Sequence, residues 1–167
     1  MGVVLVGANP AVRLRDGDRV SAFASVWQVD WSERGSGPAV VLWHAGRLRL
    51  LGPDPELADW LADTFVRHFG EVTGLAWEPV TEPVDVSLEM DLGRGLTAKA
   101  ADVVVEISQV RDRRPFRQDG LTLGGATYNL SNVFAPCGAA TVTVGGEPVP
   151  GIPDPAFLAV AEVWATP

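Results

Sequence analysis

The chain of 167 residues has a single cysteine, Cys137, so no disulfide can form within it. Nothing in the sequence therefore calls for an oxidising compartment. Basic residues are also scarce, since 13 lysines and arginines face 21 acidic residues and give a formal net charge of −8. A field of this sign repels phosphates and anionic lipid head groups, so we expect neither nucleic acid nor a membrane as a partner.

Long apolar runs and targeting signals are missing as well. Residues 1–7 have neither the basic start nor the apolar length of a signal peptide. No segment approaches the roughly 20 apolar residues that a transmembrane helix needs. The composition, 47% hydrophobic and 20% charged, is close to the globular average. We expect one soluble, cytoplasmic domain over 1–167, and the preference for arginine over lysine suggests a bacterial, GC-rich genome.

Recognisable cofactor and metal motifs are also absent from the sequence. Residues 2–9 contain an apolar run and a glycine, but they lack the glycine spacing and the following helix of a dinucleotide-binding motif. The acidic residues do not follow the spacing of a compact metal site. We therefore predict no cofactor and no metal.

Alternating apolar and polar residues predict β-strands in the first third of the chain. Residues 20–31 place several aromatic side chains on one face, including Trp27 and Trp31. Residues 39–44 and 47–51 flank Ala-Gly, which is typical of a tight hairpin.

The same alternation predicts strands in the second half. Residues 84–91 and 97–110 form a long hairpin with one apolar and one acidic face. Residues 121–134 continue the sheet, with a bulge or bend at two successive glycines, and 141–144 form another strand. Residues 156–164 fit either a helix or a closing strand.

One amphipathic helix is predicted at about 55–69. Asp54 is suited to cap its first turn, and Pro55 suits the first helical position. Apolar residues then recur at steps of three and four, and Gly70 fits a C-terminal cap. Eight or so strands with one helix favour a mainly β fold, either an antiparallel β-barrel or a strongly bent sheet. A two-sheet sandwich is the alternative.

A short stretch near the end resembles a known family. From Tyr128 to Gly151, an apolar strand, the run 140–146 and the sequence Val-Pro-Gly resemble the end of lipocalin-like hydratase domains. The element of acidic residue, tryptophan and glycine that should follow is missing. The resemblance implies a lipocalin-like barrel, and it assigns no role to any residue.

Aromatic and arginine side chains are the candidate ligand-binding residues. The six tryptophans include Trp27, Trp31 and Trp43 on predicted strands and Trp60 on the predicted helix. Such rings can line an apolar cavity, and the alternative is ordinary core packing. Arg114 belongs to the only basic cluster, which could hold a ligand anion or could neutralise the acidic hairpin.

Three residues are candidate catalytic groups. Lys99, the only lysine, shares its parity with apolar neighbours, so a desolvated amine could form a Schiff base, although its stem could also reach water. Glu89 belongs to the acidic face, which could raise a carboxyl pKa or be a solvated outer face. His44 could act in acid–base chemistry, alone or with Cys137 as a nucleophile.

These patterns together predict a β-barrel that binds a small apolar molecule. It could be a cofactor-independent isomerase, cyclase or hydratase of bacterial biosynthesis, because enclosure and a few placed polar groups can catalyse such reactions. The alternative function is a non-catalytic interaction module that pairs through exposed strand edges with a partner or, as a homodimer, with a second copy.

Overall fold

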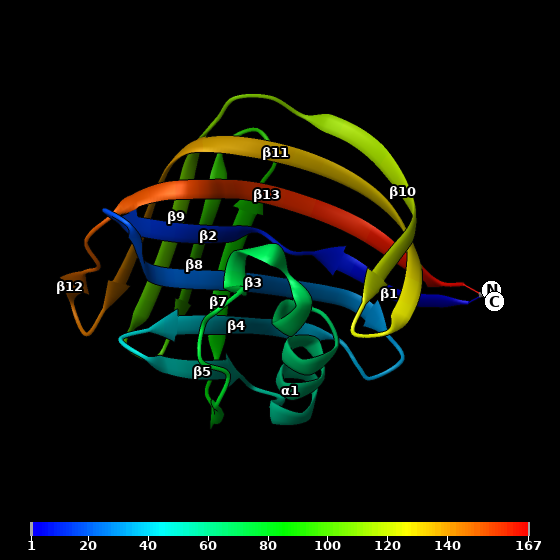
Figure 1. The fold of residues 1–167 in the computed structure, drawn as a ribbon, viewed down its shortest axis with the longest axis horizontal. Coiled ribbons are helices and arrows are strands. Elements are labelled where there is room, and N and C mark those ends of the chain that lie inside the picture. Colours follow the sequence, from blue (N-terminus) through cyan, green and yellow to red (C-terminus); the bar gives the residue numbers. More distant parts are fainter. Residues whose placement is uncertain (1, 167) are drawn as a thin grey trace.

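The computed structural model describes residues 2–166 as one large, bent β-sheet with a short helical segment against one face (Figure 1). The helical elements are α1 (Pro55–Thr64) and the 3-10 turns η1 (Val66–His68) and η2 (Gly70–Val72). The strands are β1 (Val3–Ala8), β2 (Ala11–Asp16), β3 (Arg19–Ser32), β4 (Gly37–His44), β5 (Arg47–Gly52), β6 (Pro79–Pro83), β7 (Val86–Asp91), β8 (Gly95–Ala100), β9 (Val103–Val110), β10 (Arg114–Leu123), β11 (Ala126–Val144), β12 (Glu147–Pro148) and β13 (Ile152–Ala165).

The sheet folds into two layers because one long strand belongs to both. Its order is β6-β5-β4-β3-β1-β13-β11-β9-β8-β7, with β2 between β3 and β13, and with β10 and β12 beside β11. The strand β11 pairs with β13 up to Pro136 and with β9 from Cys137 onward. We call β1 to β6, β10, β13 and residues 126–136 the main layer. The second layer is β7, β8, β9 and residues 137–144, and Figure 1 shows its strands crossing behind the main layer.

This architecture confirms the mainly β fold and the strongly bent sheet. The described strand order ends at β6 on one side and β7 on the other, so the sheet is open rather than wrapped into one ring. The sheet is mixed, because β6 pairs with β5 in parallel. The helical segment between β5 and β6 carries the chain back to the same end of the sheet.

The central part of the main layer is buried on both faces. Along β3, Ala22, Ala24 and Val26 pack against the second layer, whereas Phe23 and Trp27 pack toward α1. Successive side chains of a strand point to opposite faces, so a strand that is covered on both sides reads as a nearly continuous apolar run. The result is two cores that share one sheet.

The helix begins where the sequence predicts and ends earlier. The Asp54 carboxylate accepts a hydrogen bond from the Leu57 amide at 3.1 Å, and Pro55 is the first helical residue. The α-helix stops at Thr64 instead of residue 69, and the chain tightens into η1. This tightening accompanies the burial of two adjacent side chains, Phe65 and Val66, which leave only 3% and 0% of their surfaces exposed.

Two strand boundaries differ from the prediction, and one ambiguity is resolved. The glycines at 124–125 form the turn between β10 and β11, both with positive φ, rather than a bulge within one strand. The expected strand 97–110 is two strands separated by a turn at Ala101 and Asp102. Residues 156–164 are part of β13, so the closing strand is correct.

A charged cluster joins the two layers at their shared edge. The Arg49 guanidinium on β5 forms two hydrogen bonds with the Glu82 carboxylate on β6, at 2.6 and 2.8 Å. The same group donates to Asp102 in the turn between β8 and β9 at 2.7 Å. These bonds hold the pKa of Glu82 and of Asp102 below their ordinary values, chiefly through the hydrogen bonds from Arg49.

Replacing the arginine should weaken this junction. We expect Arg49→Met to lower the free energy of unfolding by about 1–2 kcal/mol, because charge-assisted hydrogen bonds between partly exposed groups are lost. Urea denaturation at neutral pH measures the change. The matched control is Arg67→Met, which removes an exposed pair with Asp63 and should change the stability by less than about 0.5 kcal/mol. Equal effects of the two variants would contradict this role.

The same cluster predicts an acid-dependent contribution to stability. Because both carboxyl pKa values are lowered in the folded state, the unfolded chain binds protons first as the pH falls. The contribution is therefore complete above the ordinary carboxyl pKa of about 4 and disappears below it. The stability difference between wild type and Asp102→Asn should shrink between pH 7 and pH 3. A difference that stays constant would exclude this linkage.

Candidate functional site

An apolar cavity of about 270 Å³ lies between the main layer and the helical segment, on the side away from the second layer. Its walls come from five strands, β1, β3, β10, β11 and β13, and from the chain that follows α1. The lining residues are Leu5, Gly7, Asn9, Trp27, Phe65, Phe69, Glu71, Phe116, Leu121, Leu123, Tyr128, Leu130, Asn132, Phe134, Phe157, Ala159, Ala161 and Val163. Most of these side chains are apolar, and seven of them are aromatic, including the indole of Trp27 and the phenol of Tyr128.

The floor of the cavity is hollow because small residues meet on neighbouring strands. Gly7 on β1 pairs with Ala161 on β13, and Ala161 pairs with Asn132 on β11. Ala159 lies two residues before Ala161 and therefore on the same face of β13. Gly7 cannot be enlarged without a clash, because a Cβ there would overlap the Gln28 carbonyl oxygen of β3.

The roof is formed by aromatic rings of the helical segment and by the tip of the β10–β11 hairpin. Phe65 packs against Trp27 and Tyr128, with ring centroids 5.8 and 5.7 Å apart. The ring of His68 lies directly over Gly124 in the hairpin turn, so the roof and the hairpin support each other. Phe116 on β10 remains 41% exposed and lies where the cavity meets solvent.

Two buried polar atoms of lining residues have no hydrogen-bond partner within residues 2–166. They are the indole Nε1 of Trp27 and the amide Oδ1 of Asn132. A third amide, that of Asn9, is held by its own hydrogen bonds, because its Nδ2 donates to the Ser25 hydroxyl at 2.8 Å and to the Val26 carbonyl at 2.9 Å. Buried polar groups are normally paired, so the unpaired donor and acceptor stand out.

The tryptophans predicted to bind a ligand are not gathered at one place. Trp27 lines the cavity, but Trp43 and Trp60 only pack around the same core without lining it. Trp31 is 50% exposed, which contradicts the aromatic face expected for residues 20–31. The pairing of β3 with β1 shifts between Val29 and Trp31, and the extra residue turns Trp31 to the opposite face.

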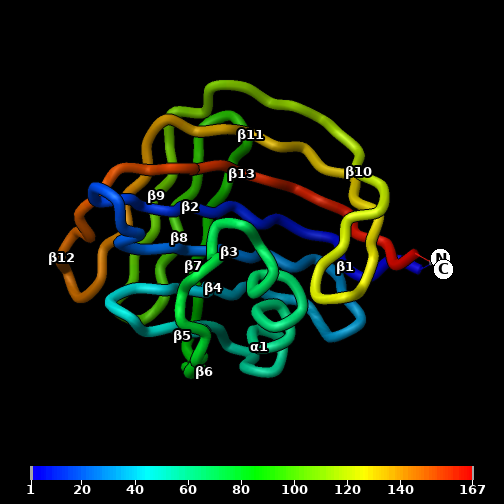
Figure 2. Tube along the Cα trace, in the orientation of Figure 1, coloured from blue at the N-terminus to red at the C-terminus, as the bar shows by residue number. Residues whose placement is uncertain are grey.

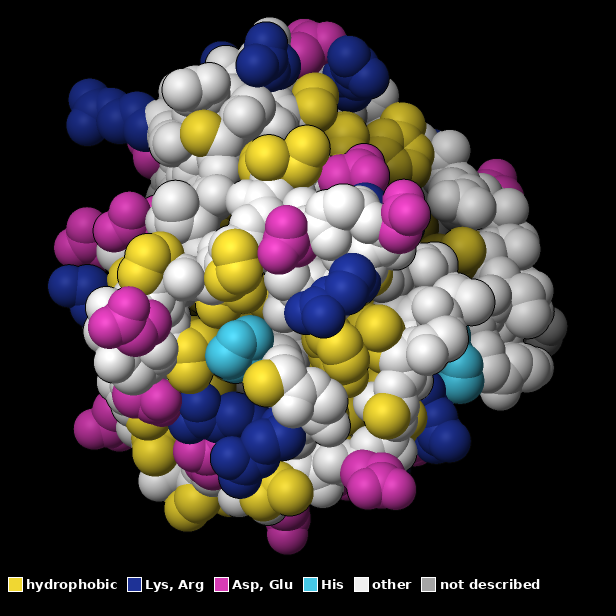
Figure 3. Space-filling model, turned by 60° about the vertical axis from the view of Figure 1, so that its left-hand side comes forward, with side chains coloured by type: hydrophobic (Ala, Val, Ile, Leu, Met, Phe, Trp, Pro, Cys, Tyr) yellow, Lys and Arg dark blue, Asp and Glu magenta, His cyan; other side chains and the backbone are white. Residues whose placement is uncertain are grey.

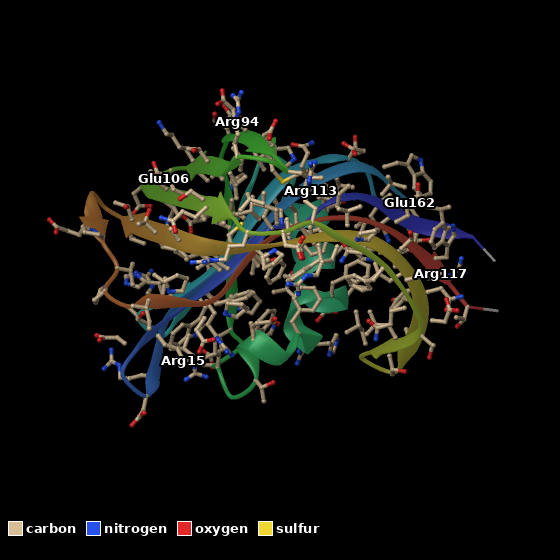
Figure 4. The ribbon with its side chains drawn as sticks, turned by 90° about the horizontal axis from the view of Figure 1, so that it is seen from above. Arg15, Arg94, Glu106, Arg113, Arg117 and Glu162 are labelled. Atoms are coloured by element: carbon tan, nitrogen blue, oxygen red, sulfur yellow. The ribbon has the colours of Figure 1, made fainter. Side chains whose placement is uncertain are left out.

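The structure does not bring the predicted catalytic residues to the cavity. Lys99 is exposed, because the two-residue turn that follows β8 reverses the parity that had grouped it with the apolar side chains. Glu89 is exposed on the outer face of the second layer, which Figure 4 marks with Glu106 and Arg94. His44 is the last residue of β4. Arg114, which was predicted to bind a ligand, is exposed and forms an ion pair with Asp112 at 2.8 Å.

Cys137 is also unsuited to the nucleophile role considered for it. Its thiol donates to the Ala135 carbonyl at 3.4 Å and packs with the core between the two layers. Burial raises the pKa of this thiol above its ordinary value, which favours the unreactive protonated form.

The site residues that sequence reasoning missed are phenylalanines and small residues. Phe65, Phe69, Phe116, Phe134 and Phe157 line the cavity from four separate segments. The spacing of Phe157, Ala159 and Ala161 was visible as alternation in a possible closing strand. Nothing in the sequence indicated that this strand would pair with β1 and place Ala161 beside Gly7.

The surface and the comparisons add no further assignment. Within the described residues there is no group of three potential metal ligands and no helix of the length and apolarity that a bilayer crossing requires. On the face shown in Figure 3, acidic and basic side chains are interspersed, and hydrophobic side chains reach the surface between them. No family model, curated protein or solved structure matches this chain significantly.

Tyr128 is the only tyrosine in the sequence and lines the cavity, so its ionisation is a spectroscopic probe of the cavity. Burial raises the pKa of its phenol, and the negative charge of Glu33 raises it further. We expect ultraviolet difference titration to show ionisation at a higher pH than the value of about 10 for free tyrosine. Glu33→Gln should lower the midpoint only in part, because burial is the larger cause, and Glu78→Gln should leave it unchanged. A wild-type midpoint at or below that of free tyrosine would refute the described environment.

Proposed function

We propose that this protein binds a small, largely apolar molecule in the cavity beneath the helical segment. The observation that carries the proposal is a space of about 270 Å³ with a floor of Gly7, Ala159 and Ala161 and with aromatic walls. Protein interiors are usually packed to crystal-like density, so a hollow of this size within a core needs a reason. Ligand sites are typically concave, apolar and provided with a few polar groups.

The size of the cavity limits the ligand. A dry cavity of roughly 150 Å³ can hold benzene. A volume of about 270 Å³ therefore suits one ring with substituents or a compact two-ring molecule. Long acyl chains would have to extend past Phe116 into solvent.

On the other face of the main layer, the part that lies under the second layer is closely packed. Leu42, Val105 and Leu158 are each fully buried between the two layers. There the partner is a second sheet, which packs against Ala22, Ala24 and Val26 of β3 and against Leu158 of β13. On the cavity side the partner is a helix of ten residues followed by two short turns, which covers less of the curved surface.

Filling the floor tests the proposal. Ala161→Leu should weaken the binding of 4-ethyltoluene, a substituted benzene of suitable size, at least tenfold because the added side chain occupies the space of the ring. Its melting temperature in the absence of ligand should stay the same or rise, as expected when a cavity is filled. Isothermal titration and the shift of the melting temperature by the ligand measure the two effects.

The control is Ala126→Leu, which adds the same atoms at an exposed position of β11 outside the cavity. It should bind 4-ethyltoluene like the wild type. If the wild type does not bind this probe, or if Ala161→Leu binds it equally well, the cavity is not a ligand site.

A further inference from the structure

We infer that the ligand is a ring compound with a positively charged amine, so that the cavity selects cations over anions of the same shape. This inference rests on the proposed function and specifies the chemistry of the same cavity. It starts from Glu71, the only charged residue among those that line the cavity. One carboxylate without a basic group gives the lining a net negative charge at neutral pH.

The carboxylate of Glu71 has no partner within residues 2–166. The residue belongs to η2 and is half-buried, and none of the described ion pairs or side-chain hydrogen bonds includes it. By contrast, Glu82 and Asp102 are both neutralised by Arg49. An unpaired charge acts over several ångströms and is screened least where solvent is excluded. An amine in the cavity is therefore attracted to Glu71 without having to touch it.

Basic groups near the cavity do not offset this charge. No lysine, arginine or histidine is among the lining residues of the described chain. On β10, Arg114 pairs with Asp112 at 2.8 Å, and Arg117 pairs with Asp119 at 3.1 Å and lies at the outer rim in Figure 4. A carboxylate or phosphate in the cavity would lose its hydration without gaining a cation, which is costly.

A second negative charge acts on the cavity lining. Burial raises the pKa of the Tyr128 phenol, and the charge of Glu33, an exposed residue directly after β3, raises it further. Tyr128 lines the cavity, so the field of Glu33 reaches the lining with the same sign as that of Glu71. The two carboxylates come from separate segments of the chain, and both favour a cation.

The aromatic lining favours the same ligand. Seven of the lining residues are aromatic, and the faces of aromatic rings attract cations such as ammonium groups. A fully buried ammonium would still be costly, so the amine belongs at the mouth, where Phe116 is 41% exposed. The apolar ring then fills the space over Gly7 and Ala161. The ligand class is thus an aromatic ring with an alkylamine chain.

The experiment compares three probes that share a 4-methylphenyl group. 2-(4-Methylphenyl)ethylamine is 4-ethyltoluene with an ammonium group at the end of its ethyl chain, and 4-methylphenylacetate is an anion of similar size. Calorimetric titration at pH 7 measures the three affinities. The wild type should bind the amine at least about fivefold more tightly than the acetate. Glu71→Gln should weaken binding of the amine by about two- to fivefold, the effect of one partly exposed ion pair, and leave 4-ethyltoluene unchanged.

Glu78→Gln is the matched control. It removes the same charge from an exposed residue between η2 and β6 that does not line the cavity, so it should leave all three affinities unchanged. Ala161→Leu should weaken binding of the amine at least tenfold, as it does for 4-ethyltoluene, because both rings occupy the same floor. Binding of 4-ethyltoluene by Glu71→Gln and Glu78→Gln shows that each variant is folded.

The outcomes separate this inference from the proposed function. If neither 4-ethyltoluene nor the amine binds, both fail. If 4-ethyltoluene binds but Glu71→Gln binds the amine like the wild type, the cavity is a binding site and the selection of cations is wrong. Acetate binding as tight as that of the amine would also overturn the inference. So would amine binding that survives Ala161→Leu, because the amine would then be held on the acidic surface.

Discussion

The constraint that governs this structure is that one sheet must bury both of its faces. Residues 21–27 of β3 and 39–42 of β4 are buried at every position, so neither face of this part of the main layer can be left in water. The long strand β11 satisfies one face by bending into the second layer and bringing β7, β8 and β9 against it. The other face depends on the chain between β5 and β6, which is short for the area it covers.

The cavity follows from this unequal coverage. The helical segment and the β10–β11 hairpin close over the curved sheet only where large rings reach across, as Phe65 does toward Trp27 and Tyr128. At the centre of the floor, the small residues Gly7 and Ala161 leave space that larger side chains would fill. The hollow is therefore produced by the distribution of large and small residues over distant segments, and every one of those segments is needed to enclose it.

Much of the fold could be predicted from local patterns, and the site could not. Alternation identified the strands around Trp27 and Val105, and the Asp-Pro pair located the start of α1. The errors at Trp31 and Lys99 have a common cause, since a bulge and a two-residue turn each reverse the parity on which strand faces are assigned. Such reversals depend on the partner strand, which no local pattern specifies.

The cavity itself depends on pairings between residues that are far apart in the chain. In Figure 2 the first and last strands run side by side to the two described ends, and Gly7 on β1 faces Ala161 on β13. The centre of the main layer thus joins the earliest and the latest parts of the described chain. Contacts of such large sequence separation form slowly, because most of the backbone must be ordered before they close. During synthesis, the rings of Trp27, Phe65 and Tyr128 emerge before β13, which completes the floor, so they lack this part of their cover until β13 has left the ribosome.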